Sequence, residues 1–253
     1  MRLAGKVTLV VGGTRGIGRG IVESFAREGA AALFAGRDAR AAAAVVHAVA
    51  ADGGKAHFVP CDATDLEQLH RAIAGVADAH GRLDVLVNNA GRVVGRSLLE
   101  STEDDYDRLF DLNVRASFFG TKWGAEIMCA NGGGSIINIA SAAATRAFRD
   151  RSLYSATKAA VLMMSKAAAL DLAPYNVRIN CISPGTVDTD LLRGVHFEGC
   201  SDQDRLVREL GAEQPLGRVG SVQEIGAAAV YLASEDARWI TGANLNVDGG
   251  AAL

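Results

Sequence analysis

The sequence is poor in residues that form disulfides or bind metals. It contains four cysteines and five histidines among 253 residues. Neither kind clusters, and the cysteines stand far apart at Cys61, Cys129, Cys181 and Cys200, with no Cys-x-x-Cys pair. This distribution excludes a disulfide framework and lacks the ligand spacing of a zinc site. We therefore expect free, mostly buried thiols and no bound metal.

A strong charge of either sign is also missing. The formal net charge is −3, and acidic and basic residues are interspersed along the chain. No electrostatic argument therefore favours nucleic acid or an anionic membrane as a partner. Apolar runs such as Val7–Val11 are far too short to span a bilayer, and no signal-peptide pattern opens the sequence. We expect a cytoplasmic protein that binds neither nucleic acid nor a membrane.

What the sequence does contain is an alternation of apolar, β-type runs with helical stretches. The strands are predicted at 6–11, 31–35, 56–60, 83–87, 135–140, 177–182 and 243–247. The helices are predicted near 17–28, 38–51, 65–80, 103–130, 152–173 and 221–233. Short apolar strands separated by helices indicate a parallel sheet that is covered on both faces. The predicted fold class is α/β, a single doubly wound domain over residues 1–253 with a seven-stranded parallel sheet.

A glycine-rich turn follows the first predicted strand. Its residues are Gly12-Gly13-Thr14-Arg15-Gly16-Ile17-Gly18. Glycines at a strand-to-helix turn permit positive φ angles and a close backbone approach, while the N–H groups of the following helix attract a pyrophosphate. A glycine turn alone is a weak signal, because any tight turn favours glycine. Its position after the first strand of an α/β pattern strengthens the prediction of a dinucleotide site.

A second candidate site consists of Ser141, Tyr154 and Lys158. Tyr154 and Lys158 are four residues apart in a predicted helix, so their Cβ atoms lie roughly 5–6 Å apart on one face. An ammonium group beside a phenol lowers the tyrosine pKa from its usual value of about 10, which makes an acid/base near neutral pH. A nearby serine hydroxyl would hold a carbonyl oxygen. The alternative is a surface Tyr/Lys pair, with Ser141 as an ordinary turn residue.

Two further motifs accompany the glycine turn and this trio. They are Asn88-Asn89-Ala90-Gly91 after the fourth predicted strand and the later run Pro184-Gly185-Thr186-Val187-Asp188-Thr189. With all of these in order, the chain resembles the short-chain dehydrogenase/reductase (SDR) family over essentially its whole length. Two departures are local, since Val11 stands in place of a threonine and Ala140 in place of the first serine of a pair. The resemblance implies a Rossmann-type fold and hydride transfer between a nicotinamide cofactor and a carbonyl or alcohol.

The resemblance also implies roles for single residues. Tyr154 would donate or remove the proton, Ser141 would steady the substrate oxygen, and Lys158 would also bind the nicotinamide ribose. Asn113 would complete a catalytic tetrad by holding, through its backbone, a water that links Lys158 to solvent; otherwise it is a polar residue that interrupts a helix. The residues implied to contact the cofactor are Gly12, Thr14, Arg15, Gly16, Ile17, Gly18, Arg37, Asp62, Ala63, Asn89, Ala90, Gly91, Tyr154, Lys158, Pro184, Gly185, Val187 and Thr189.

The end of the second predicted strand bears on the choice of cofactor. NAD sites usually place an acid there for the ribose 2′-OH, whereas this chain has Gly36 followed by Arg37. Arg37 and Arg15 would clamp a 2′-phosphate, because guanidinium groups match phosphate geometry. Asp38 is harmless as the cap of the next helix but would repel the phosphate if it turned inward. We predict NADP(H), with NAD(H) as the alternative.

The resemblance places the substrate above the nicotinamide, against three segments of the chain. The residues implied to contact it are Ser141, Ala143, Val93, Arg149, Tyr154 and Leu192. Apolar residues are interspersed with charged ones after Thr189, so residues 189–215 are predicted to form a mobile helical lid. Arg149 and Arg151 would attract an anionic substrate or would only be surface charges.

We predict an oxidoreductase that uses NADP(H) to interconvert a small-molecule ketone or aldehyde and an alcohol. One alternative is reduction of 3-oxoacyl groups on acyl carrier protein, which is disfavoured because the segments 128–134 and 174–176 are neutral where an acidic carrier would dock. Another is NAD-dependent dehydrogenation of an alcohol, sugar or steroid. A cofactor-binding scaffold without turnover is least favoured, because it would not require a proton donor. The resemblance also implies a homotetramer.

Overall fold

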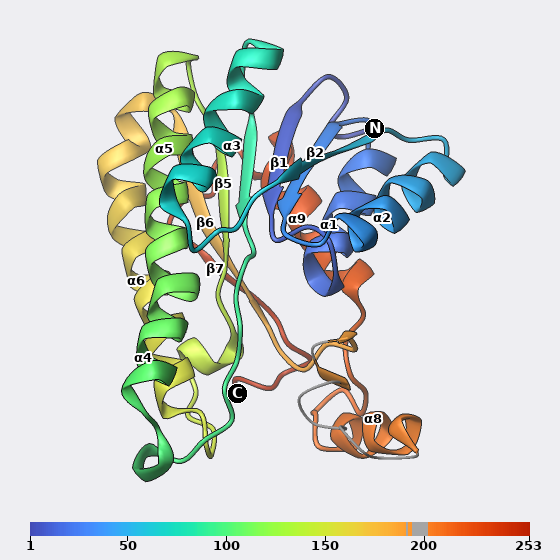
Figure 1. The fold of residues 1–253 in the computed structure, drawn as a ribbon, viewed down its shortest axis with the longest axis vertical. Helices are drawn as coiled ribbons and strands as arrows, with labels where there is room; N and C mark the ends of the chain where they lie inside the picture. The colour runs from blue at the N-terminus through green and yellow to red at the C-terminus, as the bar shows by residue number, and fades with distance from the viewer. Residues whose placement is uncertain (191, 194–201) are drawn as a thin grey trace.

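The computed structural model describes residues 1–190, 192–193 and 202–253 (Figure 1). Its centre is a parallel sheet of seven strands in the order β3-β2-β1-β4-β5-β6-β7. The strands are β1 (Val7–Val11), β2 (Ala31–Gly36), β3 (Ala56–Pro60), β4 (Val85–Asn88), β5 (Gly134–Ile139), β6 (Val177–Pro184) and β7 (Asn244–Val247). The predicted sheet is confirmed, and each strand end lies within two residues of its predicted position.

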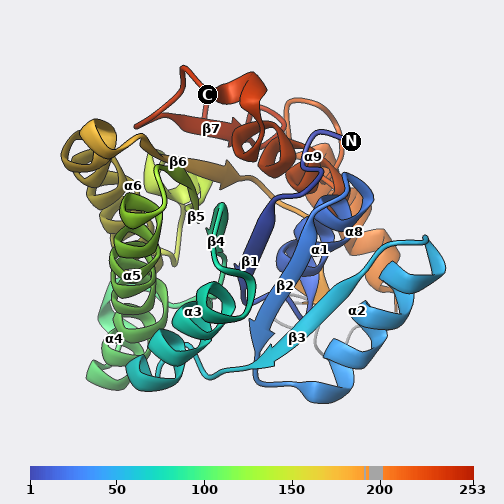
Figure 2. The ribbon, with the colours of Figure 1, turned by 90° about the horizontal axis from the view of Figure 1, so that it is seen from above.

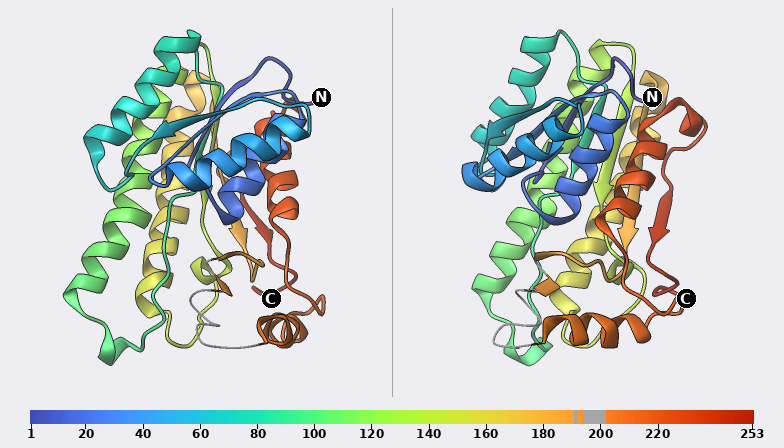
Figure 3. Two further views of the ribbon diagram at one scale, coloured as in Figure 1. Left: turned by 45° about the vertical axis from the view of Figure 1, so that its right-hand side comes forward. Right: turned by 90° about the vertical axis from the view of Figure 1, so that its right-hand side faces the viewer.

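Helices cover both faces of this sheet (Figure 2). One face carries α1 (Gly16–Arg27), α2 (Ala39–Ala51) and α9 (Val222–Ala233), and the other α3 (Leu66–His80), α5 (Ala116–Ala130) and α6 (Ser152–Leu172). α4 (Glu103–Leu109) precedes α5 in the chain, and α8 (Gln203–Ala212) lies beyond the carboxyl ends of the strands, apart from both layers (Figure 3). Short 3₁₀ turns are η1 (Leu98–Glu100), η3 (Ala142–Ala144), η4 (Ala173–Tyr175) and η5 (Glu235–Ala237). Within the described residues, no helix is both long and apolar enough to cross a membrane.

The core has two layers, one on each side of the sheet. Val10 of β1 packs toward Phe25 of α1, whereas Leu9 packs toward Ile73 of α3 on the opposite face. All five positions of β1 are buried for this reason, and the strand reads as an uninterrupted apolar run. Full burial of one such side chain contributes roughly 1.5–3 kcal/mol. The two layers therefore hold the strand ends, and the loops that follow them, in fixed positions.

The strand order reverses direction at β1. This strand pairs with β2 on one side and with β4 on the other. The loops that leave β1 and β4 therefore run to opposite faces of the sheet, and a crevice opens between them at the carboxyl edge. The glycine-rich turn follows β1, and the Asn88-Asn89-Ala90-Gly91 motif begins at the end of β4. Both motifs consequently border the crevice.

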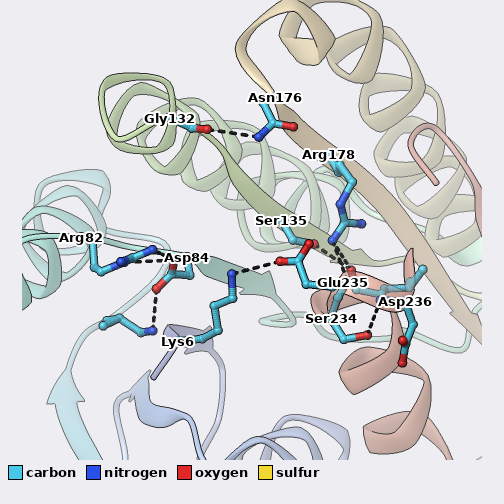
Figure 4. A network of polar contacts seen from close by, with 12 residues as sticks. Lys6, Arg82, Asp84, Gly132, Ser135, Asn176, Arg178, Ser234, Glu235 and Asp236 are labelled. Carbon is cyan, nitrogen blue, oxygen red and sulfur yellow. Dashed lines mark hydrogen bonds and ion pairs between the residues drawn. The ribbon is translucent and has the colours of Figure 1, made fainter. Parts of the chain in front are cut away.

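At the opposite, amino edge, polar groups pair with one another (Figure 4). Buried Asp84 accepts a hydrogen bond from the Val7 amide at 2.8 Å and forms an ion pair with Arg82. Arg178 of β6 donates to the carbonyl oxygen of Leu232, near the end of α9, at 2.8 Å. These contacts tie strands to one another and to a helix. They leave the polar groups at this edge occupied within the protein.

The predicted helix over 103–130 is confirmed as a helical stretch, but it is not uniform. The chain forms α4, then a π-helical segment, η2 (Phe110–Arg115), and then α5 without a break. Asn113 lies in this wider turn, where its amide bonds the backbone N and O of Arg92 at 2.8 and 3.0 Å and the Thr157 hydroxyl at 3.0 Å. A π-turn inserts one extra residue into a helix and is frequent at functional sites. These partners come from segments distant in sequence, so helical periodicity alone did not predict the π turn.

Aspartate side chains cap the starts of two helices. Asp38 caps α2 by accepting a hydrogen bond from the Ala41 amide at 2.9 Å. Asp65 caps α3 by accepting from the amides of Glu67 and Gln68. Each aspartate satisfies N–H groups that have no partner inside the helix. Asp38 is thereby held at the start of α2, beside the predicted cofactor site.

Candidate active site

A cleft of about 1160 Å³ opens at the carboxyl edge of the sheet. Of the predicted cofactor residues, all except Gly18 line it, and so do all of the predicted substrate residues. Of the four predicted catalytic residues, Ser141, Tyr154 and Lys158 line the cleft and Asn113 does not. The fold thus brings residues from most of the chain to one cavity, which is large enough for a cofactor together with a small substrate.

Ser141, Tyr154 and Lys158 meet where β5 ends and α6 begins. Ser141 is a hydrogen-bonding neighbour of Tyr154 that acts to lower its pKa, and the Ala143 amide donates to the Ser141 oxygen at 3.1 Å. The Nζ atom of Lys158 lies 5.9 Å from the centre of the Tyr154 ring and donates to the carbonyl oxygen of Ile139 at 2.8 Å. Only 5% of Lys158 is exposed. The alternative of a surface Tyr/Lys pair is therefore wrong.

Burial sets the proton affinities of this pair. It raises the pKa of Tyr154 above the ordinary value, although the Ser141 hydrogen bond and the Arg151 charge act in the opposite direction. It lowers the pKa of Lys158 to about 8. The expected fall in the Tyr154 pKa is therefore wrong for this structure, because desolvation of the phenolate outweighs the Ser141 hydrogen bond and the Arg151 charge. Tyr154 keeps its proton at neutral pH, so it is ready to donate it.

Asn113 lies behind the cleft and braces one wall. It is fully buried, and its bonds to Arg92 fix the segment that follows β4. Gly91 separates it from the lysine: a Cβ atom there would lie 3.2 Å from the Asn113 amide oxygen and 3.4 Å from Lys158 Nζ. The Asn113 carbonyl oxygen accepts a hydrogen bond from the Ser117 hydroxyl at 2.8 Å. Its water-mediated link to Lys158 stays a prediction.

The glycine-rich turn has the geometry of a phosphate cradle. Gly12 and Gly16 adopt positive φ angles of 83° and 52°. A Cβ atom at Gly18 would lie 2.0 Å from the Gly12 carbonyl oxygen, so any larger residue there would push the turn apart. No side chain caps the first turn of α1, and no acidic residue lies in it. Its N–H groups and positive dipole end therefore fit the pyrophosphate of a dinucleotide.

The end of β2 has no room for an acidic side chain. A Cβ atom at Gly36 would lie 2.7 Å from the Thr14 methyl group. A hollow of about 550 Å³ adjoins it, lined by Thr14, Arg15, Arg37, Asp38 and Ala39. In place of an acid at the end of β2, as in a typical NAD site, the hollow has two arginines together with the Asp38 carboxylate of the next helix.

Both of those arginines contact carboxylates. Asp38 turns toward Arg15, with 2.5 Å between the Arg15 guanidinium and the carboxylate. The Ala41 amide and Arg15 together hold the pKa of Asp38 below its ordinary value. Arg37 pairs with Asp62 at 3.4 Å. The two arginine side chains are 60% and 73% exposed, and ion pairs in such positions are weak. A phosphate entering the hollow would therefore draw on both guanidinium groups.

The predicted lid is described only in part. Residues 191 and 194–201, which include Cys200, lie outside the described residues. At its start, the Thr189 hydroxyl accepts a hydrogen bond from the Leu192 amide at 3.2 Å. At its end, α8 contributes Leu210 to the cleft, and Gln214 follows in the next turn. The described parts therefore border the cleft, and lid motion stays a prediction.

Several residues that line the cleft were not predicted from the sequence. Arg108 and Asp111 reach the cleft from α4 and η2, and Ala251 reaches it from the end of the described chain. The Arg146 guanidinium donates to the carbonyl oxygen of Ala251 and lies 5.5 Å from the Phe148 ring centre. No local pattern marks these residues, because only the packing of distant segments brings them to the cavity.

The comparisons with known proteins agree with this fold. The family model described as enoyl-(acyl carrier protein) reductase matches residues 11–252. A sorbitol dehydrogenase from Cereibacter sphaeroides is 37% identical, with 99% of this chain and 98% of the relative covered. A short-chain dehydrogenase/reductase from Serratia marcescens superposes with a TM-score of 0.90 at 37% identity over the whole of both chains. A blue fluorescent protein from a metagenomic library, solved with NADPH, gives 0.88 at 37% identity, also over the whole of both chains.

Proposed function

The chain belongs to the short-chain dehydrogenase/reductase family, and from this premise we propose that it is a cytoplasmic, NADP(H)-dependent enzyme that interconverts a small-molecule ketone or aldehyde and the corresponding alcohol. One observation carries this proposal: Ser141, Tyr154 and the buried Lys158 line the same cleft as the glycine-rich turn, which has the geometry of a phosphate site. A binding protein without turnover would have no chemical use for a buried proton donor beside a buried lysine.

The roles of the side chains follow from their positions. Bound NADPH supplies a hydride from nicotinamide C4 to the carbonyl carbon. Tyr154 donates its phenolic proton to the carbonyl oxygen as negative charge develops there, and in the oxidative direction it takes that proton back. The Ser141 hydroxyl, oriented by the Ala143 amide, hydrogen-bonds the same oxygen. Lys158, held by the Ile139 carbonyl, places an ammonium group beside the phenolate that remains.

The choice of NADP(H) rests on the end of β2. The Thr14 methyl group occupies the space that an acidic side chain at position 36 would need. Arg15 and Arg37 border the adjoining hollow, where they would contact a 2′-phosphate. The structural relative that binds NADPH supports the same choice. The alternative, NAD(H), would leave these guanidinium groups without a phosphate partner.

The neutral charge of segments 128–134 and 174–176 does not count against an acyl carrier substrate. The neutral segment 128–134 leads into β5 at the amino edge of the sheet, where Asn176 bonds the Gly132 carbonyl oxygen (Figure 4). This edge faces away from the cleft, so its lack of charge does not bear on substrate entry. An acyl thioester therefore belongs among the substrates that are tested.

A homotetramer is part of the proposal. Apolar side chains are exposed on the outer helices, with Phe118 of α5 at 51% and Met163 and Leu170 of α6 at 64% and 80%. Burial of these side chains against another copy would remove them from water. Light scattering at micromolar concentration is expected to report a tetramer, and a monomer would contradict this part of the proposal.

The decisive test is a spectrophotometric screen at the absorbance of the reduced nicotinamide. Ketones, aldehydes, acetoacetyl thioesters, sugars and steroids are offered with NADPH and with NADH, and alcohols with the oxidised forms. We expect turnover with at least one carbonyl compound and a higher kcat/KM with NADPH. Turnover with a clear NADH preference would overturn the cofactor assignment alone. If no compound reacts with either nucleotide, while NADPH still binds in calorimetry, the scaffold alternative is supported instead.

A further inference from the structure

Three arginines line the cleft on the side of the reacting groups. Arg92 follows the end of β4 in the chain, and Arg149 and Arg151 belong to the loop between η3 and α6. All three line the same cavity as Ser141 and Tyr154. None of them belongs to the glycine-rich turn or to the end of β2, where the nucleotide is expected. They therefore bear on the substrate.

Two of these arginines have identified contacts: the Arg92 backbone with Asn113, and the Arg151 guanidinium with Gly95. Both hydrogen-bonding groups of the Arg92 backbone are held by the buried Asn113 amide, at 2.8 and 3.0 Å. The Arg151 guanidinium packs against Gly95, where a Cβ atom would lie 2.4 Å from it. The charge of Arg151 also acts to lower the pKa of Tyr154, which agrees with its position near the phenol. The framework thus fixes the backbone of Arg92 and the guanidinium of Arg151 at this wall.

The backbone between the other two arginines is unusual. Asp150 separates Arg149 from Arg151 and adopts a positive φ of 55°, which non-glycine residues seldom do. Its carbonyl oxygen accepts a hydrogen bond from the Arg151 guanidinium at 3.1 Å. Arg151 is also the residue that precedes α6, three positions before Tyr154. The loop therefore turns sharply between two arginines that both line the cavity.

The positive charges of Arg92 and Arg149 are not balanced as most others are. Many arginines of this protein pair with a carboxylate, including Arg108 with Asp104 at 2.8 Å in α4. In the described ranges, by contrast, no carboxylate lies within 4.0 Å of the Arg92 or Arg149 guanidinium. Guanidinium groups that line a cavity are suited to bind carboxylate or phosphate oxygens in pairs.

The acidic residues of the same cavity do not cancel this charge. Asp111 of η2 faces Arg115 at 3.6 Å. Glu213 follows the end of α8, and Asp190 follows Thr189 at the start of the predicted lid. Asp190 lies close enough to Arg15, on the nucleotide side, to influence its pKa. The wall formed by the Arg92 segment and the Ser141 loop therefore stays positive.

We propose that the preferred substrate carries an anionic group, a carboxylate or a phosphate, which Arg92 and Arg149 bind while Tyr154 faces the reacting carbonyl or alcohol. This inference rests on the proposed function. It adds a substrate class to it, because the same catalytic groups would otherwise serve a neutral ketone equally well. Arg151, beside the phenol, directs the anion toward the same wall.

The test compares acids with neutral partners of nearly the same shape. Levulinate and acetoacetate are measured against their methyl esters, and dihydroxyacetone phosphate against dihydroxyacetone, each with saturating NADPH. We expect at least one acid to exceed its neutral partner in kcat/KM by about tenfold or more, as a bound charge pair of about 1.4 kcal/mol would give. The two acid types separate a carboxylate site from a phosphate site. Raising the salt to about 0.5 M should reduce this ratio, since exposed charges are screened.

Variants assign the effect to the two arginines. Arg92→Gln with Arg149→Gln should collapse the ratio of acid to neutral kcat/KM toward unity, whereas Arg238→Gln, an exposed arginine next to η5 at the amino edge, should preserve it. If no acid exceeds its neutral partner, or if the double variant retains the full ratio, the anionic substrate class is wrong. Turnover of the neutral partners alone would leave the proposed function standing. Absence of turnover with every compound would remove both.

Discussion

The polar side chains at the two edges of the sheet differ in their surroundings. At the amino edge, Asp84 is bonded by the Val7 amide and paired with Arg82, and Arg178 donates to the Leu232 carbonyl oxygen (Figure 4). At the carboxyl edge, Tyr154 and its neighbours face a cavity of about 1160 Å³. Both edges contain buried charged or titratable side chains, so burial alone does not mark an active site. What differs is whether the polar groups are satisfied by the protein or directed into a cavity.

The two edges differ in how many partners stabilise a buried polar side chain. Asp84 is accommodated in a buried position because the Val7 amide donates to it and the Arg82 guanidinium pairs with it. Lys158 has one carbonyl partner, from Ile139, and burial lowers its pKa to about 8. A saturated network stabilises the fold, whereas an incompletely satisfied group near neutrality can exchange a proton with a ligand. The following predictions separate these two roles.

The largest effect is expected from Tyr154→Phe at the carboxyl edge. Removal of the phenolic proton should lower kcat by about a thousandfold or more, since general acid/base catalysis contributes up to about 10⁴. NADPH binding, measured by fluorescence titration, and the thermal unfolding midpoint should change little, because ring packing is preserved. Full activity of the variant would place the proton donor elsewhere in the cleft.

A complementary effect is expected from Asp84→Ala at the amino edge. This change leaves the buried Val7 amide and the Arg82 guanidinium without their partner, and should lower the free energy of unfolding by about 3 kcal/mol. The kcat of the folded enzyme should be unchanged. Urea unfolding measures the loss. Asp52→Ala is the matched control, since its pair with Arg27 is 60% exposed on the aspartate side and should contribute little. Equal effects of both changes would contradict the comparison.

The pH dependence of stability should reveal the buried lysine. Burial lowers the pKa of Lys158 from 10.5 to about 8, so between these values the native protein releases a proton that the unfolded chain retains. The free energy of unfolding therefore rises from pH 8 toward pH 10, by about 2 kcal/mol, from this group. Above about pH 10 the raised pKa of Tyr154 acts in the opposite sense, because the phenol ionises first in the unfolded chain.

The measurement is urea unfolding of the wild type and of Lys158→Met across this pH range. The difference between the two proteins should grow as the pH rises from 8 to 10 in favour of the wild type. A difference that stays constant with pH would mean that the lysine is not shifted by burial. Lys166→Met serves as a control on the same helix, because Lys166 is exposed.

The smallest effect is expected at the nucleotide end of the cleft. Arg37→Ala should lower kcat/KM for NADPH by about tenfold, as loss of one phosphate contact would, while kcat/KM for NADH stays nearly constant. Stability should not change, since the Arg37–Asp62 pair is largely exposed on the arginine side. An equal loss with both nucleotides would show that Arg37 does not recognise the 2′-phosphate.

Much of the architecture was readable from the sequence for physical reasons. A strand buried on both faces must be largely apolar, so β1, β2 and β4 appear as short apolar runs. Asp38 and Asp65 could be assigned as helix caps because capping depends on the next three residues only. The four-residue spacing of Tyr154 and Lys158 likewise placed them on one face of α6. All of these features are local.

The tertiary structure alone decided what surrounds those residues. Tertiary packing placed a π turn in the predicted helix 103–130 around Asn113, whose amide bonds partners after β4 and in α6. The packing of the glycine-rich turn against α2 also paired Asp38 with Arg15. The tertiary structure also reversed the expected direction of the Tyr154 pKa. Spacing along the chain fixes which groups share a face, but desolvation and pairing depend on segments far away in sequence, and only their packing around the cleft determines the charge that each group carries.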